Sequence, residues 1–241
     1  MPRSLGIIAS SVMVSNNVVF KNYVAQGWNN VNSTTLVLTT SQQVDIGDTV
    51  FVAIATDNLT ANTPMPAVTD SAGNSWSMYC VGGVGATAGT GVIGAIVATI
   101  ATKTIPSGGT ITITLDGSVT AKGAVVLSYT NCILTLRTGT WAGASNVAGG
   151  VTTPSAQVGD LLIGMCAQEH ASMPIDGAAA DSSLGSAWTV YWSQSGGGTA
   201  NAGVRVIFQS KVPTIAGTQN FSYPTAPYTD YLWIAAVFQH K

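Results

Sequence analysis

Hydrophobic and polar residues alternate in this chain with the period of two that is typical of β-strands. The segment Thr110–Leu115 reads Thr-Ile-Thr-Ile-Thr-Leu, which places the apolar side chains on one face and the threonines on the other. No stretch of a dozen residues shows helical periodicity with capping residues at its ends. The pattern therefore predicts strands and no helices.

Runs rich in β-branched and aromatic residues give the expected strands. In the first part of the chain they are 34–39, 49–55, 75–81, 92–102, 110–115 and 121–130, and in the second part 160–167, 187–193, 203–212, 219–223 and 231–239. Turn sequences such as Pro106-Ser107-Gly108-Gly109 separate them. Many short strands without intervening helices predict an all-β antiparallel sandwich, of jelly-roll or immunoglobulin-like topology.

A second pattern is an internal repeat with a spacing of about 112 residues. The sequence around Asp48, a Gly-Asp pair before an apolar run, returns around Asp160, which is 112 residues later. Trp76 and Trp188 are separated by the same interval. A period of this length suits two tandem domains better than a solenoid, whose repeats are far shorter.

The repeat predicts an extended N-terminal arm over residues 1–30, a first β-sandwich over 31–131 and a second over 132–241. The arm contains apolar residues that precede the first domain and have no obvious core of their own. We expect them to contact a neighbouring protein and tether the chain to an assembly, for example as a strand added to a sheet edge. These candidate assembly residues are Leu5, Ile7, Ile8, Val12 and Met13.

The segment 81–102 contains no charged residue, and its length is sufficient for a membrane span. It is rich in glycine and threonine, however, and its counterpart in the second copy contains Arg205 and Lys211 at alternating positions. This pattern favours a strand, and we expect no membrane insertion.

The composition limits the classes of partner. Charged residues make up only 7% of the chain, hydrophobic residues make up 46%, and the formal net charge is −2. A clustered basic face for nucleic acid is therefore not expected. The uncharged polar surface that serine, threonine, asparagine, glutamine and glycine provide suits contact with other proteins.

The three cysteines, Cys80, Cys132 and Cys166, do not lie at matching places in the two copies, and no Cys-x-x-Cys pair is present. We therefore expect free thiols, no zinc site and no cofactor.

Residues for acid–base chemistry are scarce. The best group is Gln168-Glu169-His170 with Asp176 or Asp181 nearby in sequence, and a Ser–His–Asp site could be imagined from Ser172, His170 and Asp181. No Gly-x-Ser-x-Gly motif supports such a site. The first copy has Thr-Asp-Asn at the matching position, with no histidine. We therefore predict that the protein is not an enzyme.

The Gly-Asp pairs at Asp48 and Asp160 precede apolar strands. An aspartate in such a turn hydrogen-bonds the local backbone, and the glycine supplies positive φ. We interpret these aspartates as structural, and calcium ligation is the alternative interpretation. No metal ligand is assigned.

The tryptophans fall into two groups. Trp76 and Trp188 begin a strand in each copy and are expected in the core. Trp28 and Trp141, separated by 113 residues, precede the first expected strand of each copy. They are candidates either to close the end of a sandwich or to serve as exposed platforms for a glycan.

The strings Ile46–Ala53 and Val68–Trp76, followed by an apolar strand that ends in Leu127-Ser128-Tyr129, resemble a β-sandwich module of tailed-bacteriophage virion proteins. The similarity is to modules of minor tail proteins, and also to some head-decoration and fibre proteins, and it extends as two modules over residues 26–240. In the second module, Asp181–Trp188 keeps only part of this pattern, with the aspartate at its start and the tryptophan at its end.

This resemblance implies a non-enzymatic structural protein of the virion, docked in multiple copies on the extracellular particle after synthesis in the host cytoplasm. Its partners would be other virion proteins and copies of itself. The alternative is a carbohydrate-binding or adhesin module for a glycan of the host surface. A secreted glycan-active enzyme is a third and weaker hypothesis.

Overall fold

The structure is a computed structural model, and it describes residues 16–57, 66–87, 90–145, 150–152, 155–169, 188–194, 203–218, 220–222 and 230–241. Within these residues the secondary structure consists of β-strands and turns, without helix, so the expected all-β class is confirmed. The described residues contain no helix long and apolar enough to cross a membrane.

The first half of the chain forms two antiparallel sheets. Its strands are β1 (Val19–Asn29), β2 (Ser33–Thr39), β3 (Thr49–Asp57), β4 (Pro66–Asp70), β5 (Ser77–Thr87), β6 (Thr90–Ile100), β7 (Thr110–Val119) and β8 (Lys122–Thr130). Inner sheet 1 has the order β1-β8-β3-β6-β5, and outer sheet 1 has the order β2-β7-β4.

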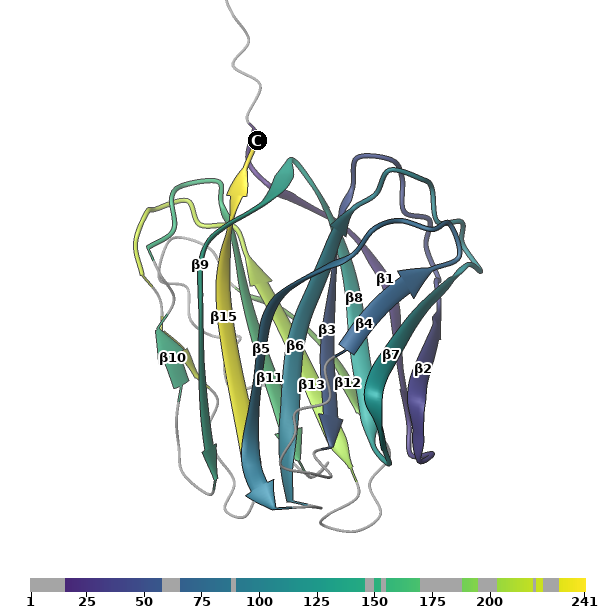
Figure 1. Cartoon of the computed structure of the whole chain (residues 1–241). Coiled ribbons are helices and arrows are strands. Elements are labelled where there is room, and N and C mark those ends of the chain that lie inside the picture. The colour runs from purple at the N-terminus through teal and green to yellow at the C-terminus, as the bar shows by residue number, and fades with distance from the viewer. Residues whose placement is uncertain are drawn as a thin grey trace, which may run out of the picture.

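The second half forms two further sheets. Its strands are β9 (Cys132–Ser145), β10 (Gly150–Thr152), β11 (Leu161–Glu169), β12 (Thr189–Gln194), β13 (Val204–Lys211), β14 (Asn220–Ser222) and β15 (Asp230–His240). Inner sheet 2 has the order β9-β15-β11-β13-β12, and outer sheet 2 pairs β10 with β14. Figure 1 shows β2, β7 and β4 on one side of the molecule and β10 on the opposite side.

Seven of the eight strands in the first half have the order of a jelly roll, and β5 departs from it, because the fifth strand of a jelly roll pairs with the fourth. In this topology the first strand pairs with the eighth, the eighth with the third and the third with the sixth, while the second pairs with the seventh and the seventh with the fourth. The first half has all of these pairings, with β5 added to the edge of inner sheet 1 beside β6. An immunoglobulin fold pairs sequential strands differently, so the topology decides between the two alternatives that the sequence left open.

The second half repeats this order. Each strand of inner sheet 1 has a counterpart at the same place in inner sheet 2. In order across the sheets, β1-β8-β3-β6-β5 corresponds to β9-β15-β11-β13-β12. The register of the strands agrees between the two halves. Thr49 begins β3 and pairs with Ile100 of β6 and Tyr129 of β8. Its equivalent Leu161 begins β11 and pairs with Phe238 of β15. The sequence repeat therefore corresponds to a structural repeat, with the boundary at Asn131.

The two inner sheets pack face to face and bury a single apolar cluster between them. The contacts follow the pattern of an isologous dimer: β1 lies over β12, which is the counterpart of β5, and β5 lies over β9, which is the counterpart of β1. At the centre the sheets approach so closely that a Cβ on Gly94 would lie 2.8 Å from Leu232 Cδ2. The chain is thus built as a covalently joined pseudo-dimer.

Aromatic rings pack against one another at one end of this interface. The ring of Phe51 lies 4.7 Å from that of Phe238 and 5.8 Å from that of Tyr129, both in edge-to-face geometry. A second apolar cluster fills the space between inner sheet 1 and outer sheet 1, where alternate residues of β3 such as Val50, Val52 and Ile54 point. Every residue of β3 is consequently buried, because the strand has a core on each face.

The structure corrects two expectations from the sequence. Residues 19–29 are not part of an arm over residues 1–30, because they form β1 and pair with β8 along the edge of inner sheet 1. Trp28 and Trp141 are not equivalent, since Trp28 lies opposite Gly123 and the equivalent place on β9 is Gly143, opposite Leu232. A register shift in β1 between Tyr23 and Ala25, which has no counterpart in β9, breaks the correspondence.

We predict that the two halves unfold together. Phe51→Ala removes a fully buried ring from the shared interface and should lower the free energy of unfolding by about 3–5 kcal/mol. Because loss of either half would expose the inner sheet of the other, thermal or denaturant unfolding should remain a single transition. Val37→Ala, at an exposed position on β2, should change stability by less than about 0.5 kcal/mol. Two separate transitions, only one of them shifted by Phe51→Ala, would contradict this prediction.

Candidate functional site

The Gly-Asp turns place a buried carboxylate beside the first strand of each half. In the first half the amide of Asp48 donates to the carbonyl of Asp45, and Gly47 between them has a φ of 90°. This is the geometry of a turn that requires positive φ at its third residue, which glycine adopts without strain. The turn directs the Asp48 side chain inward, where it accepts a hydrogen bond from the Asp45 amide at 2.8 Å.

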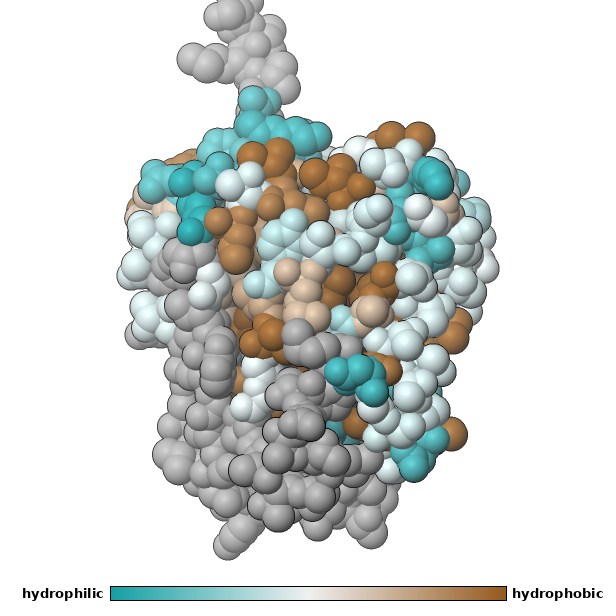
Figure 2. Space-filling model, viewed as in Figure 1, coloured by the Kyte–Doolittle hydropathy of each residue, from teal (hydrophilic) through white to brown (hydrophobic). Residues whose placement is uncertain are grey.

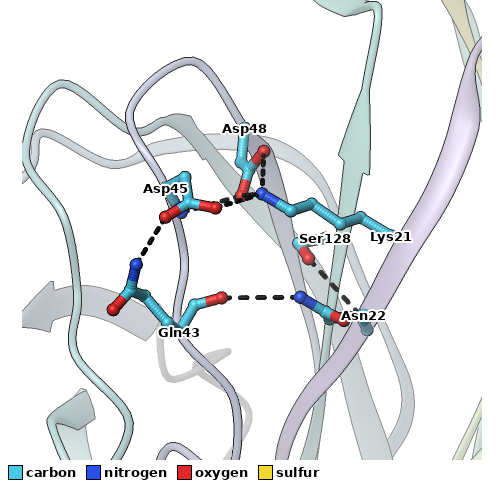
Figure 3. A network of polar contacts seen from close by, with 6 residues as sticks. All are labelled: Lys21, Asn22, Gln43, Asp45, Asp48 and Ser128. Carbon is cyan, nitrogen blue, oxygen red and sulfur yellow. Dashed lines mark hydrogen bonds and ion pairs between the residues drawn. The ribbon is translucent and has the colours of Figure 1, made fainter.

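Lys21 lies between the two carboxylates of this turn, as Figure 3 shows. Its ammonium nitrogen is 2.6 Å from Asp45 Oδ2, and 2.9 and 2.7 Å from the two oxygens of Asp48. Gln43 donates to the other oxygen of Asp45 at 2.6 Å. Burial by itself would lower the pKa of Lys21, but the bonds to both aspartates outweigh it and raise that pKa above its usual value.

The second half has the same turn with a different set of partners. Gly159 has a φ of 87°, and the side chain of Asp160 is fully buried. Its Oδ2 accepts hydrogen bonds from Arg137 Nε at 2.7 Å and from the Gln157 amide at 2.9 Å. His240 Nδ1 lies 2.9 Å from Oδ1 of the same carboxylate.

Burial would raise the pKa of Asp160, but the hydrogen bonds from Arg137, the Gln157 amide and His240 reverse the effect, and the pKa lies below its usual value. Asp160 is therefore ionised in the folded protein at neutral pH. Its charge is balanced by the Arg137 guanidinium, which keeps the buried carboxylate from being an isolated charge.

The two cations occupy equivalent positions. Lys21 is the extra residue of a register shift in β1 opposite Tyr129 and Ser128, and Arg137 is the extra residue of a shift in β9 opposite Phe238 and Val237. A β-bulge redirects a side chain that a regular strand would point elsewhere. In both halves the bulge brings a cation onto the buried aspartate. The sequence reasoning missed these cations because a bulge has no reliable signal in a single sequence.

The arrangement supports the structural interpretation of Asp48 and Asp160. Each carboxylate caps its own turn and pairs with a basic side chain, so the place of a metal ion is taken by the chain's own cation. Among the described residues, no group of three or more histidine, cysteine, aspartate or glutamate side chains has the geometry of a metal site.

Asp70 stabilises a further turn before β5. Its carboxylate accepts hydrogen bonds from the amides of Ala72 and Gly73 at 2.8 and 2.9 Å, and from Trp76 Nε1 at 2.7 Å. Trp76 packs against the outer core of the first half, while its counterpart Trp188 is buried with the Lys211 ammonium 5.4 Å above its ring. Both tryptophans therefore lie where the sequence predicted, against the cores.

The residues of the weak catalytic hypothesis are only partly described. Glu169 ends β11, and Gln168 before it is buried. His170, Ser172, Asp176 and Asp181 lie outside the described residues. The candidate assembly residues Leu5, Ile7, Ile8, Val12 and Met13 also lie outside them.

A groove open to solvent lies between β1 and β12, where the edges of the two inner sheets meet. It encloses about 410 Å³ and is lined by Tyr23, Gln26, Val190 and Tyr191. The rings of Tyr23 and Tyr191 are stacked across it at 5.5 Å and 17°, and Phe20 stacks on Tyr191 at 5.4 Å. Burial, together with the neighbouring Tyr191, raises the pKa of Tyr23 to about 12, so its hydroxyl stays protonated.

Trp28, a candidate glycan contact, follows Gln26 by two positions on β1 and lies on the same face of the strand. Its side chain is 51% exposed. Trp141 of β9, the other candidate, pairs with Ile234 of β15 and is equivalent to Gln26. Its side chain lies outside the described part of the structure. Trp28 thus lies on β1 beyond the four lining residues, on the same strand as Tyr23 and Gln26, whereas Trp141 belongs to β9, which is not one of the two strands of the groove. The tyrosines that line it were not singled out by the sequence.

Comparisons with protein-family models, with curated proteins and with solved structures found no match to this chain.

We predict that Asp160→Asn lowers the free energy of unfolding by about 1.5–3 kcal/mol at neutral pH, because the charge-assisted hydrogen bonds to Arg137 are weakened. The pKa of Asp160 is depressed in the folded state, so its contribution is complete above the unfolded value of about 3.9 and is lost as the pH falls through the lower folded value. Denaturant titrations of both proteins between pH 2 and 8 should therefore converge at the acid end.

Asp116→Asn on the exposed face of β7 serves as the matched control and should alter stability by less than about 0.5 kcal/mol. A constant difference between wild type and Asp160→Asn down to pH 2 would show that the ionised carboxylate is not the stabilising species.

Proposed function

We propose that this chain is a non-enzymatic structural protein of a bacteriophage virion, docked in multiple copies on the tail or capsid surface. The observation that carries the proposal is the tandem jelly roll, in which two copies of one topology are joined through an apolar interface. Jelly rolls recur in viral capsid proteins and in lectins, so the fold supports the proposal by analogy with those proteins.

The surface gives further support. Formal charge is sparse, and apolar side chains are exposed at several separate places, among them Val31, Ile46 and Ile215. Figure 2 shows apolar side chains gathered over β9 and β5, where the edges of the two inner sheets face each other. Such a surface suits permanent contact with neighbouring proteins.

Strand edges add a second means of contact. Strands β1 and β5 lie at the two edges of inner sheet 1, and β9 and β12 lie at those of inner sheet 2. An edge strand presents backbone groups that pair with an added strand of another chain. We propose that the apolar segment before β1 makes such a contact with a virion neighbour and thereby tethers the protein.

The arm gives the test of this proposal. Deletion of residues 2–15 leaves β1 and its pairing with β8 complete, so the unfolding transition should stay unchanged. Incorporation into particles should be lost, because the tether is missing. The measurement is the amount of the chain in particles purified on a density gradient, determined by quantitative mass spectrometry.

The control variant carries a glycine–serine segment of the same length in place of residues 2–15, and it should behave like the deletion. Absence of the wild-type chain from purified particles would contradict the virion proposal. Wild-type occupancy of the deletion variant would contradict only the role of the arm.

A carbohydrate-binding function is the second candidate. The specific observation in its favour is the aromatic groove between β1 and β12.

A further inference from the structure

The groove between β1 and β12 has a counterpart on the opposite side of the pseudo-dimer. There β5 of the first half faces β9 of the second. The register of the two inner sheets makes Tyr23 equivalent to Gly139 and Tyr191 equivalent to Cys80. The same pair of places is therefore filled by two tyrosines on one side and by a glycine and a cysteine on the other.

This exchange of residues changes how closely the two strands approach at these places. A Cβ on Gly139 would lie 2.6 Å from Cys80 Sγ, so β5 and β9 are in direct contact at this point. Across the groove, in contrast, the stacked tyrosines occupy the equivalent place and leave the space of about 410 Å³ beside them. Both sides share one topology, so the groove reflects local differences. These are the exchanged side chains and the register shifts beside Tyr23 in β1 and Cys80 in β5, which β9 and β12 lack.

The lining of the groove indicates the chemistry of a ligand. None of the four lining residues is charged, which disfavours a phosphate, a nucleotide or a strongly charged peptide. The ring of Tyr191 is stacked on Tyr23 and on Phe20, and the exposed indole of Trp28 adds a flat apolar surface farther along β1. The Gln26 amide and the phenol hydroxyls provide hydrogen-bond donors and acceptors. A sugar ring has complementary features, with apolar C–H groups on one face and hydroxyl groups around its rim.

We propose that the groove formed by Tyr23, Gln26, Val190 and Tyr191 binds a neutral saccharide, and that Trp28 extends the binding surface along β1. The sugar lies against the aromatic surfaces, and Gln26 and the Tyr23 hydroxyl bond its hydroxyl groups. This inference is independent of the virion proposal, because the groove is complete within one chain.

The test begins with the full-length protein on an array of neutral and acidic oligosaccharides, followed by calorimetric titration with the neutral oligosaccharide that gives the strongest signal. Gln26→Ala and Tyr23→Phe each remove one hydrogen-bonding group and should weaken binding by about fivefold. Trp28→Ala should weaken it by a similar factor, because it removes an exposed ring.

Tyr79→Phe is the matched control, since it makes the same change beside the closed edge formed by β5 and β9. It should leave affinity unchanged, and the melting temperatures of all variants should show that they are folded. Binding of neutral saccharides with the expected losses supports the proposal. It would be overturned by an array without any neutral ligand, by equal affinity of the three groove variants and wild type, or by groove variants that alter self-association and not saccharide binding.

Discussion

The apolar contact between the two inner sheets governs the architecture of this protein. Inner sheet 1 is covered on one face by outer sheet 1 and on the other by inner sheet 2, so the first half would expose an apolar face without the second. This explains why β3 is buried along its entire length and why glycine is required where Gly94 meets Leu232. Burial of apolar area drives such association, and the covalent link removes most of the entropy cost that two separate chains would carry.

The chain has few charged groups, and the aspartates of the two turns are buried beside its apolar core. Asp48 and Asp160 fix the turns that begin the central strands β3 and β11, and a bulge in the edge strand β1 or β9 of the same sheet supplies the cation for each. A buried carboxylate without such a partner would be costly. The pairing therefore allows a polar turn to lie against an apolar core, and it links the first strand of each half to the third.

The duplication also provides an internal comparison. Where the same topology occurs twice, a difference between equivalent places reflects the local residues and strand register and not the topology. The stacked tyrosines Tyr23 and Tyr191 replace Gly139 and Cys80 at equivalent places, and a groove results. A structural role on a particle and recognition of a sugar are compatible in one such molecule, because the fold supplies the scaffold and the edge residues supply the site.

The sequence by itself determined the all-β class, the repeat and the structural turns, because alternation, glycine at positive φ and apolar runs are local properties of the chain. Strand pairing is not local. The choice of the jelly roll, the assignment of residues 19–29 to β1 and the packing of the two halves all depend on contacts between distant segments. The bulges that bring Lys21 and Arg137 to the aspartates arise from strand pairing, and so does the separate register shift after Tyr23 that ends the equivalence of Trp28 and Trp141. Only the tertiary structure decided them.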